Sequence, residues 1–162
     1  MTLLPEQRAA IRNETAISVA INAIGPTAII WLAGVAPPAT LAGADGLLGG
    51  MAKGSGIATL LMTAIVTTLI RGRVRARPAL AVAGADLPAP VRLLPTNVIL
   101  RAVMMGVVAA VLLVPVGAAA AALFDLLPLN RSGFAVFNVV FGTVVGLTMT
   151  PPVVLRALAD RR

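Results

Sequence analysis

The sequence predicts an all-α integral membrane protein, a single bundle of four transmembrane helices with both termini in the cytoplasm. Its composition, four long apolar runs and a one-sided distribution of arginine favour this fold class. Of the 162 residues, 59% are hydrophobic and 12% are charged, whereas a soluble domain has about 25% charged residues. A soluble domain of this length buries only about 70% of its surface, so a mean hydropathy of +0.98 would leave much apolar surface in water. Lipid is therefore the expected solvent.

Four segments are long enough to cross a bilayer, because a span needs roughly 20 predominantly apolar residues. Three of them contain no charged residue: 15–36, 102–124 and 134–155. The fourth, 48–70, contains only Lys53, near its outer end, where a long side chain can reach the headgroups. The cytoplasmic linker 71–97 is too short and too rich in proline to form a domain. We expect this linker to be mobile.

The basic residues indicate which ends of the spans face the cytoplasm. If the chain starts inside, only Lys53 and Arg131 of the thirteen basic residues lie outside. Cytoplasmic loops carry such an excess of arginine and lysine. The inner set includes the charged tail with Arg161 and Arg162. Because a composition rich in alanine and arginine is typical of bacteria, the predicted location is the bacterial cytoplasmic (inner) membrane.

Four arginines follow the second span at every second position: Arg71, Arg73, Arg75 and Arg77. We interpret them first as a topology signal. They are also expected to contact anionic lipid headgroups, at about 1 kcal/mol per basic residue near the surface. Nucleic acid is not an expected partner, because no aromatic residue interleaves the arginines to stack on bases.

Polar residues recur at every fourth position in three of the spans, which places them on one face of each helix. Residues that lipid rejects should point into the bundle. The candidates for this intramembrane polar face are Glu14, Ser18, Asn22, Thr59, Thr63, Thr67, Asn138 and Thr150. One interpretation is helix packing, with hydrogen bonds across helices or back to the same helix. The alternative is a polar pathway or a small-ligand cavity.

Two further contacts are predicted within the bundle. Gly142 and Gly146 have the GxxxG spacing that lets two helix backbones approach closely, so we expect them at a packing contact. Glu14 and Arg101 both lie about one turn inside the cytoplasmic interface. We expect them to form an ion pair, because bare charges are costly at this depth. The alternative is that both side chains reach water separately.

The two halves of the chain resemble each other, which favours a duplicated helix hairpin. Each hairpin ends in an aliphatic residue followed by arginine, Ile70-Arg71 and Leu155-Arg156. Aligning these steps pairs Thr63 with Thr148. The halves would be related by an axis along the membrane normal.

The absence of histidine, cysteine and tyrosine removes the commonest general base and every thiolate ligand. The sequence therefore predicts no enzymatic activity and no cofactor or metal site. We expect a non-catalytic accessory or assembly component that acts through helix packing and lipid contacts. Its expected partners are further copies of itself or a larger membrane complex. The alternative is a small oligomeric transporter or channel lined by asparagine and threonine.

Overall fold

The computed structural model describes residues 3–43 and 45–160, in which every regular element is helical. The tail arginines Arg161 and Arg162 lie outside these residues. The long helices are α1 (Pro5–Leu32), α2 (Leu47–Ala76), α4 (Val98–Leu123) and α5 (Arg131–Leu158). Each is long and apolar enough to span a membrane. The prediction of an all-helical fold with four potential spans is confirmed.

The surface of the bundle is apolar and its interior is partly polar. At most 39% of the most apolar 18-residue window of any long helix is buried. Ile24, Val111 and Leu123 are largely exposed, whereas Ser18 and Thr67 are almost completely buried. Water would favour the reverse arrangement, whereas a hydrocarbon solvent accepts the apolar side chains and drives polar groups inward.

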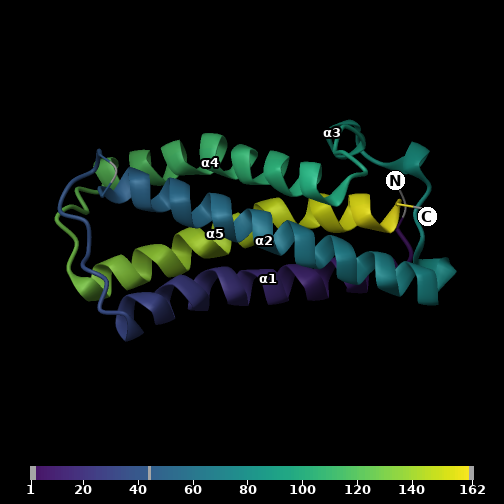
Figure 1. Ribbon diagram of the computed structural model, residues 1–162, viewed down its shortest axis with the longest axis horizontal. Coiled ribbons are helices and arrows are strands. Elements are labelled where there is room, and N and C mark those ends of the chain that lie inside the picture. The colour runs from purple at the N-terminus through teal and green to yellow at the C-terminus, as the bar shows by residue number, and fades with distance from the viewer. Residues whose placement is uncertain (1–2, 44, 161–162) are drawn as a thin grey trace.

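The helices do not pack in the order of the chain. The most extensive contacts join α1 to α5 and α2 to α4, and α2 also lies along α5. The helices of each sequential hairpin, α1 with α2 and α4 with α5, touch much less. All four lie roughly parallel to the long axis, and α1 begins at the same end of the bundle where α5 ends (Figure 1).

The long helices extend beyond the predicted spans at this end, since α1 begins at Pro5 and α2 continues to Ala76. The predicted spans follow the apolar runs, whereas the backbone hydrogen bonding of the helices continues beyond these runs. Two helix starts are capped by asparagine side chains. Asn97 accepts from the N–H groups of Ile99 and Leu100, and Asn130 accepts from that of Gly133.

The linker between α2 and α4 folds over the end of the bundle, contrary to the expectation of a mobile segment. It contains three short helices: η1 (Pro78–Leu80), η2 (Gly84–Asp86) and α3 (Ala89–Arg92). Its buried side chains join the core of the bundle: Leu80, Val82, Leu87, Val91 and Leu94. The N–H of Val82 donates to the carbonyl of Leu158 over 3.0 Å, and Gln7 donates to the carbonyl of Ala81 over 3.1 Å. The linker therefore caps the helix ends.

Thr63 and Thr148, which the sequence alignment pairs, differ in their surroundings. Thr63 is buried, whereas Thr148 is exposed and donates to the carbonyl of Val144 on its own helix. The duplicated hairpin stays a prediction.

Candidate functional site

The core is layered along the long axis. Near the loops that precede α2 and α5 lies an apolar cluster that includes Leu47, Met51 and Val114. The opposite end contains a larger apolar cluster that includes Ile70 and Val154. Between them lies a polar layer, whose buried residues are Ser18, Asn22, Ser55, Thr59, Thr63 and Thr150. The polar layer is therefore enclosed by apolar side chains toward both ends.

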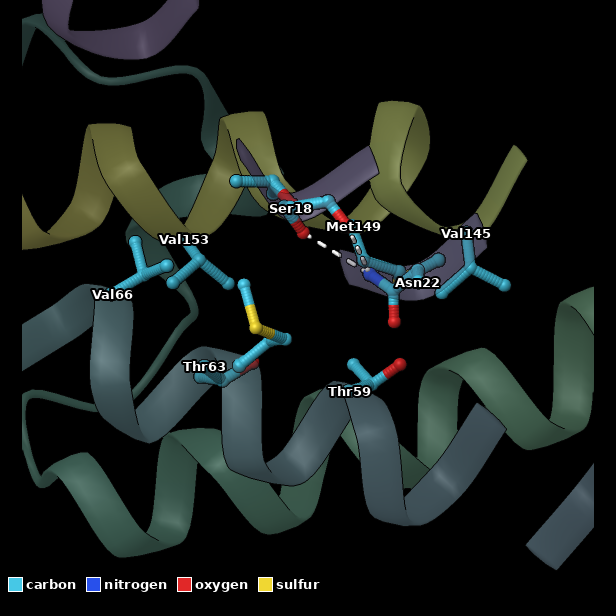
Figure 2. Close-up of a pocket in the computed structure, with 10 residues that line it drawn as sticks. Ser18, Asn22, Thr59, Thr63, Val66, Val145, Met149 and Val153 are labelled. Atoms are coloured by element: carbon cyan, nitrogen blue, oxygen red, sulfur yellow. Dashed lines mark hydrogen bonds between the residues drawn. The ribbon is translucent and has the colours of Figure 1, made fainter. Parts of the chain in front are cut away.

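The polar layer brings together predicted residues from three helices. Ser18 of α1 accepts hydrogen bonds at Oγ from Thr150 of α5 over 2.7 Å and from Asn22 Nδ2 over 3.2 Å. Asn22 Nδ2 also donates to the carbonyl of Ser18 over 2.9 Å. Figure 2 shows that these α1 residues and the α2 residues Thr59 and Thr63 face the same space.

Two small cavities adjoin these groups. The first cavity is lined by Ser18, Thr59 and Thr150, and the volume open to the centre of a water molecule in it is about 10 Å³. The second cavity is lined by Asn22, Ser55 and Asn138, and the corresponding volume is about 60 Å³. Because a single water needs roughly 10–15 Å³ on this measure, the first cavity holds about one water and the second a few.

Two hydroxyl groups in the polar layer have no hydrogen-bond partner in the described part of the chain: Ser55 Oγ and Thr59 Oγ1. Elsewhere on the long helices, Thr15 Oγ1 also lacks a partner among the described residues, whereas four hydroxyls donate to the carbonyl four residues earlier on the same helix: Thr27, Thr68, Thr143 and Thr148. An unpaired buried hydroxyl costs roughly 1–3 kcal/mol, so these two groups are available to water or to another molecule.

The remaining predicted polar residues separate into two places. Asn138 is half-buried, donates to the carbonyl of Phe134 over 2.8 Å and lines the larger cavity. Thr67 and Glu14 instead lie toward the capped end, where both are almost completely buried. The eight residues therefore extend from the larger cavity to the capped end of the bundle.

At the capped end, three arginines surround Asp160. Arg101 Nη2 donates to Asp160 Oδ2 over 2.5 Å, and Arg71 donates to the same oxygen from Nη2 over 2.7 Å and from Nε over 3.0 Å. Arg156 Nη1 lies 3.8 Å from Oδ1. Arg101 and Asp160 are both buried. One carboxylate thus joins α2, α4 and the end of α5.

The same arginines bind the end of the linker. Arg156 Nε donates to the carbonyl of Leu94 over 2.7 Å, and Arg101 Nε donates to that of Pro95 over 2.8 Å. Arg71 donates to the carbonyl of Thr96. Three consecutive carbonyls therefore face three guanidinium groups from three different helices, and these bonds hold the linker against the bundle.

The predicted Glu14–Arg101 pair is wrong. Glu14 pairs with Arg73, and Arg101 pairs with Asp160. The reason is the packing order: α1 lies mainly against α5, whereas α4, which carries Arg101, lies mainly against α2. Asp160 is the residue of this cluster that the sequence analysis did not single out. A single carboxylate four residues after Arg156, among tail arginines, was the available signal.

The four-arginine run divides into two parts. Arg71 and Arg73 form the ion pairs described above, although Arg73 is also exposed. Arg75 and Arg77 are exposed and form no ion pair with a described carboxylate. Any headgroup contact by the first two must compete with their carboxylate partners.

The glycine pair on α5 lies directly against α1. A Cβ atom added to Gly146 would lie 2.8 Å from the Cα of Val19, and one added to Gly142 would collide with the carbonyl of Asn22. Real Cβ atoms do not approach backbone so closely. The closeness of α1 and α5 therefore depends on both glycines.

No family model, no curated protein and no solved structure matches this chain. Among the described residues, no group of three histidine, cysteine, aspartate or glutamate residues could hold a metal ion.

Proposed function

We propose that the protein is a non-catalytic, multi-pass component of the bacterial cytoplasmic membrane. It acts as an accessory or assembly subunit, and its surfaces bind membrane protein and anionic lipid. The layered core is the observation that supports this role most directly. A polar solute that crossed the bundle would have to pass the apolar side chains on both sides of the polar layer.

The charged end of the bundle supports an anchoring role. The buried charges Glu14, Asp160 and Arg101 are engaged in ion pairs within the chain. Exposed arginines surround this end: Arg8, Arg12, Arg75, Arg77 and Arg92. Each exposed basic residue near an anionic surface contributes about 1 kcal/mol to membrane attraction. Placing this end in the cytoplasm brings these side chains to the leaflet with the more negative surface potential.

A small oligomeric transporter is the second candidate. The unpaired hydroxyls of Ser55 and Thr59 and the nearby amides of Asn22 and Asn138 support it, because such groups could bind a solute. The cavities are too small for more than a few waters, so a route would need a rearranged or oligomeric form.

Flux measurements on purified protein in liposomes test the proposal. We expect the wild type and the Asn22→Leu and Asn138→Leu variants to pass ions and small neutral solutes no faster than protein-free liposomes. Circular dichroism in the same liposomes verifies that each variant is folded. Flux by the wild type that is lost in folded variants would overturn the accessory role and support transport.

A further inference from the structure

The three arginines around Asp160 each adjoin an apolar run of the sequence. Arg71 and Arg156 directly follow such a run, and Arg101 directly precedes one. The end of α2, the start of α4 and the end of α5 lie at the same end of the bundle (Figure 1). Because the polar headgroups begin where the hydrocarbon core of a bilayer ends, the cluster would lie at headgroup depth in a membrane.

This cluster contains more positive than negative charge. Arginine keeps its charge in proteins, and the three guanidinium groups share the single carboxylate of Asp160. Among the described residues, no second carboxylate pairs with these arginines. Two positive charges therefore remain without a negative partner, and charges in this position are costly to leave uncompensated.

Arg71 and Arg156 present free hydrogen-bond donors at the surface of the cluster. Their side chains are 16% and 14% exposed, whereas Arg101 and Asp160 are almost completely covered. Arg71 donates to described residues from Nε and Nη2, so its Nη1 has no partner among them. Arg156 donates from Nε, and its Nη1 lies 3.8 Å from Asp160, beyond hydrogen-bond distance. An acceptor from outside can therefore bind both guanidinium groups, while the carboxylate that would repel an anion is covered.

The phosphate group of an anionic lipid fits these donors best. The planar fork of a guanidinium group matches two phosphate oxygens, and basic pockets between transmembrane helices bind anionic headgroups. A zwitterionic headgroup is a poorer ligand, because its ammonium group would lie near two uncompensated positive charges. Arg75, which is exposed one turn beyond Arg71 on α2, adds positive charge nearby.

We infer that Arg71 and Arg156 form a binding site for the phosphate group of an anionic phospholipid. Asp160 is a positioning residue, because its carboxylate holds both guanidinium groups next to each other, and Arg101 fixes that carboxylate from the buried side. The inference rests on the proposed function, in which the protein binds anionic lipid, and it names the site at which one lipid is held.

Lipid titration of the purified, delipidated protein in mild detergent tests the ligand. The rise in the midpoint of thermal unfolding gives an apparent affinity, and native mass spectrometry counts the lipids that stay bound. We expect phosphatidylglycerol to bind and to stabilise the protein, and phosphatidylcholine and inorganic phosphate to have little effect. Equal effects of the two lipids, or an equal effect of inorganic phosphate, would overturn a site for anionic lipid.

Variants of Arg156 test the residues of the site. We expect Arg156→Gln to weaken the binding of phosphatidylglycerol by about tenfold or more, because charge-assisted hydrogen bonds to the phosphate are lost. Arg156→Lys should weaken it less, since lysine keeps the charge but not the planar fork. Arg77→Gln is the matched control, because it removes the same charge from an exposed arginine outside the cluster. The control should leave the affinity nearly unchanged.

Circular dichroism verifies that each variant is folded. Unchanged affinity in folded Arg156→Gln would overturn the site, and so would unchanged affinity in Arg156→Lys if the glutamine variant does not fold. Equal losses in Arg156→Gln and Arg77→Gln would mean that attraction is spread over the surface arginines, which overturns the site and leaves the proposed lipid binding intact. Solute flux by the wild type would instead overturn the accessory role and leave the lipid site intact.

Discussion

At the residue scale, Asp160 is the common partner of the arginines at the capped end. It accepts from Nη2 of Arg101, whose Nε donates to the carbonyl of Pro95, and from Nη2 of Arg71, which also donates to the carbonyl of Thr96. Because three guanidinium groups share one carboxylate, removal of its charge would leave Arg101 buried without a counter-ion. Loss of one partner of a buried pair typically costs about 3–5 kcal/mol.

We therefore expect Asp160→Asn to lower the midpoint of thermal unfolding of the protein in detergent. The linker should also become more sensitive to protease, because the arginines that hold it lose their common partner. Asp86→Asn is the control: Asp86 is exposed in the linker, and its change removes the same charge without breaking a buried pair. Equal midpoints for the two variants would contradict the role of Asp160.

The sequence identified which residues point inward better than it identified their partners. The i, i+4 spacing of Ser18, Asn22, Thr59 and Thr63 shows one face of each helix, and these residues do meet in the polar layer. The spacing contains no information on which helices are neighbours. The predicted partner of Glu14, Arg101, was wrong for this reason. Arg101 lies on α4, whereas α1 packs mainly against α5.

At the element scale, the hydropathy pattern predicted the four helices but not the fold of the linker. Leu87, Val91 and Leu94 have the spacing of a helix face, but only Ala89–Arg92 of this stretch is an α-helix, and Leu80 and Val82 lie before it. Their burial depends on the three helix ends against which they pack, so it could only be found from the assembled bundle. Prolines stand at the starts of two of its short helices, since η1 begins at Pro78 and α3 follows Pro88.

The contact between α1 and α5 gives a prediction about glycine. Gly146→Ala places a methyl group 2.8 Å from the Cα of Val19, so the helices must move apart, at a cost of about 1–3 kcal/mol. At Gly72 on α2 an added Cβ meets nothing within 4 Å, so Gly72→Ala should be neutral or stabilising by up to about 1 kcal/mol through helix propensity. The two variants are compared by their midpoints of thermal unfolding, measured in the same detergent. A lower midpoint for Gly72→Ala than for Gly146→Ala would contradict the close contact.

At the scale of the whole molecule, the pattern of helix contacts is the same for the two hairpins. It is preserved if α1 is replaced by α4 and α2 by α5, and the reverse. The contact of α1 with α5 then corresponds to that of α4 with α2, and the weak contacts within the hairpins correspond to each other. A duplicated hairpin with an axis along the membrane normal would produce this pattern. The duplication itself stays a prediction, because the register between the halves that the sequence suggested does not match burial.

The orientation of the bundle in the membrane follows from charge. The capped end carries the exposed arginines other than Arg131, and the opposite end carries Arg131 and the loops that precede α2 and α5. Since arginine is retained on the cytoplasmic side, single cysteines should report opposite sides. We expect Ser132→Cys, at the exposed start of α5, to react with a membrane-impermeant maleimide in intact spheroplasts. Ala85→Cys, in the exposed part of the linker, should react only after the membrane is opened.

Maleimide labelling of each variant reports only the introduced cysteine, because the wild-type chain contains none. Labelling of Ala85→Cys alone in intact spheroplasts would show that the bundle is inserted the other way, and that the arginines do not set its orientation. Equal labelling of both positions before and after opening would show that the two ends do not lie on opposite sides. The four long helices would then not all cross the bilayer, and the layered core would need an explanation other than lipid around it.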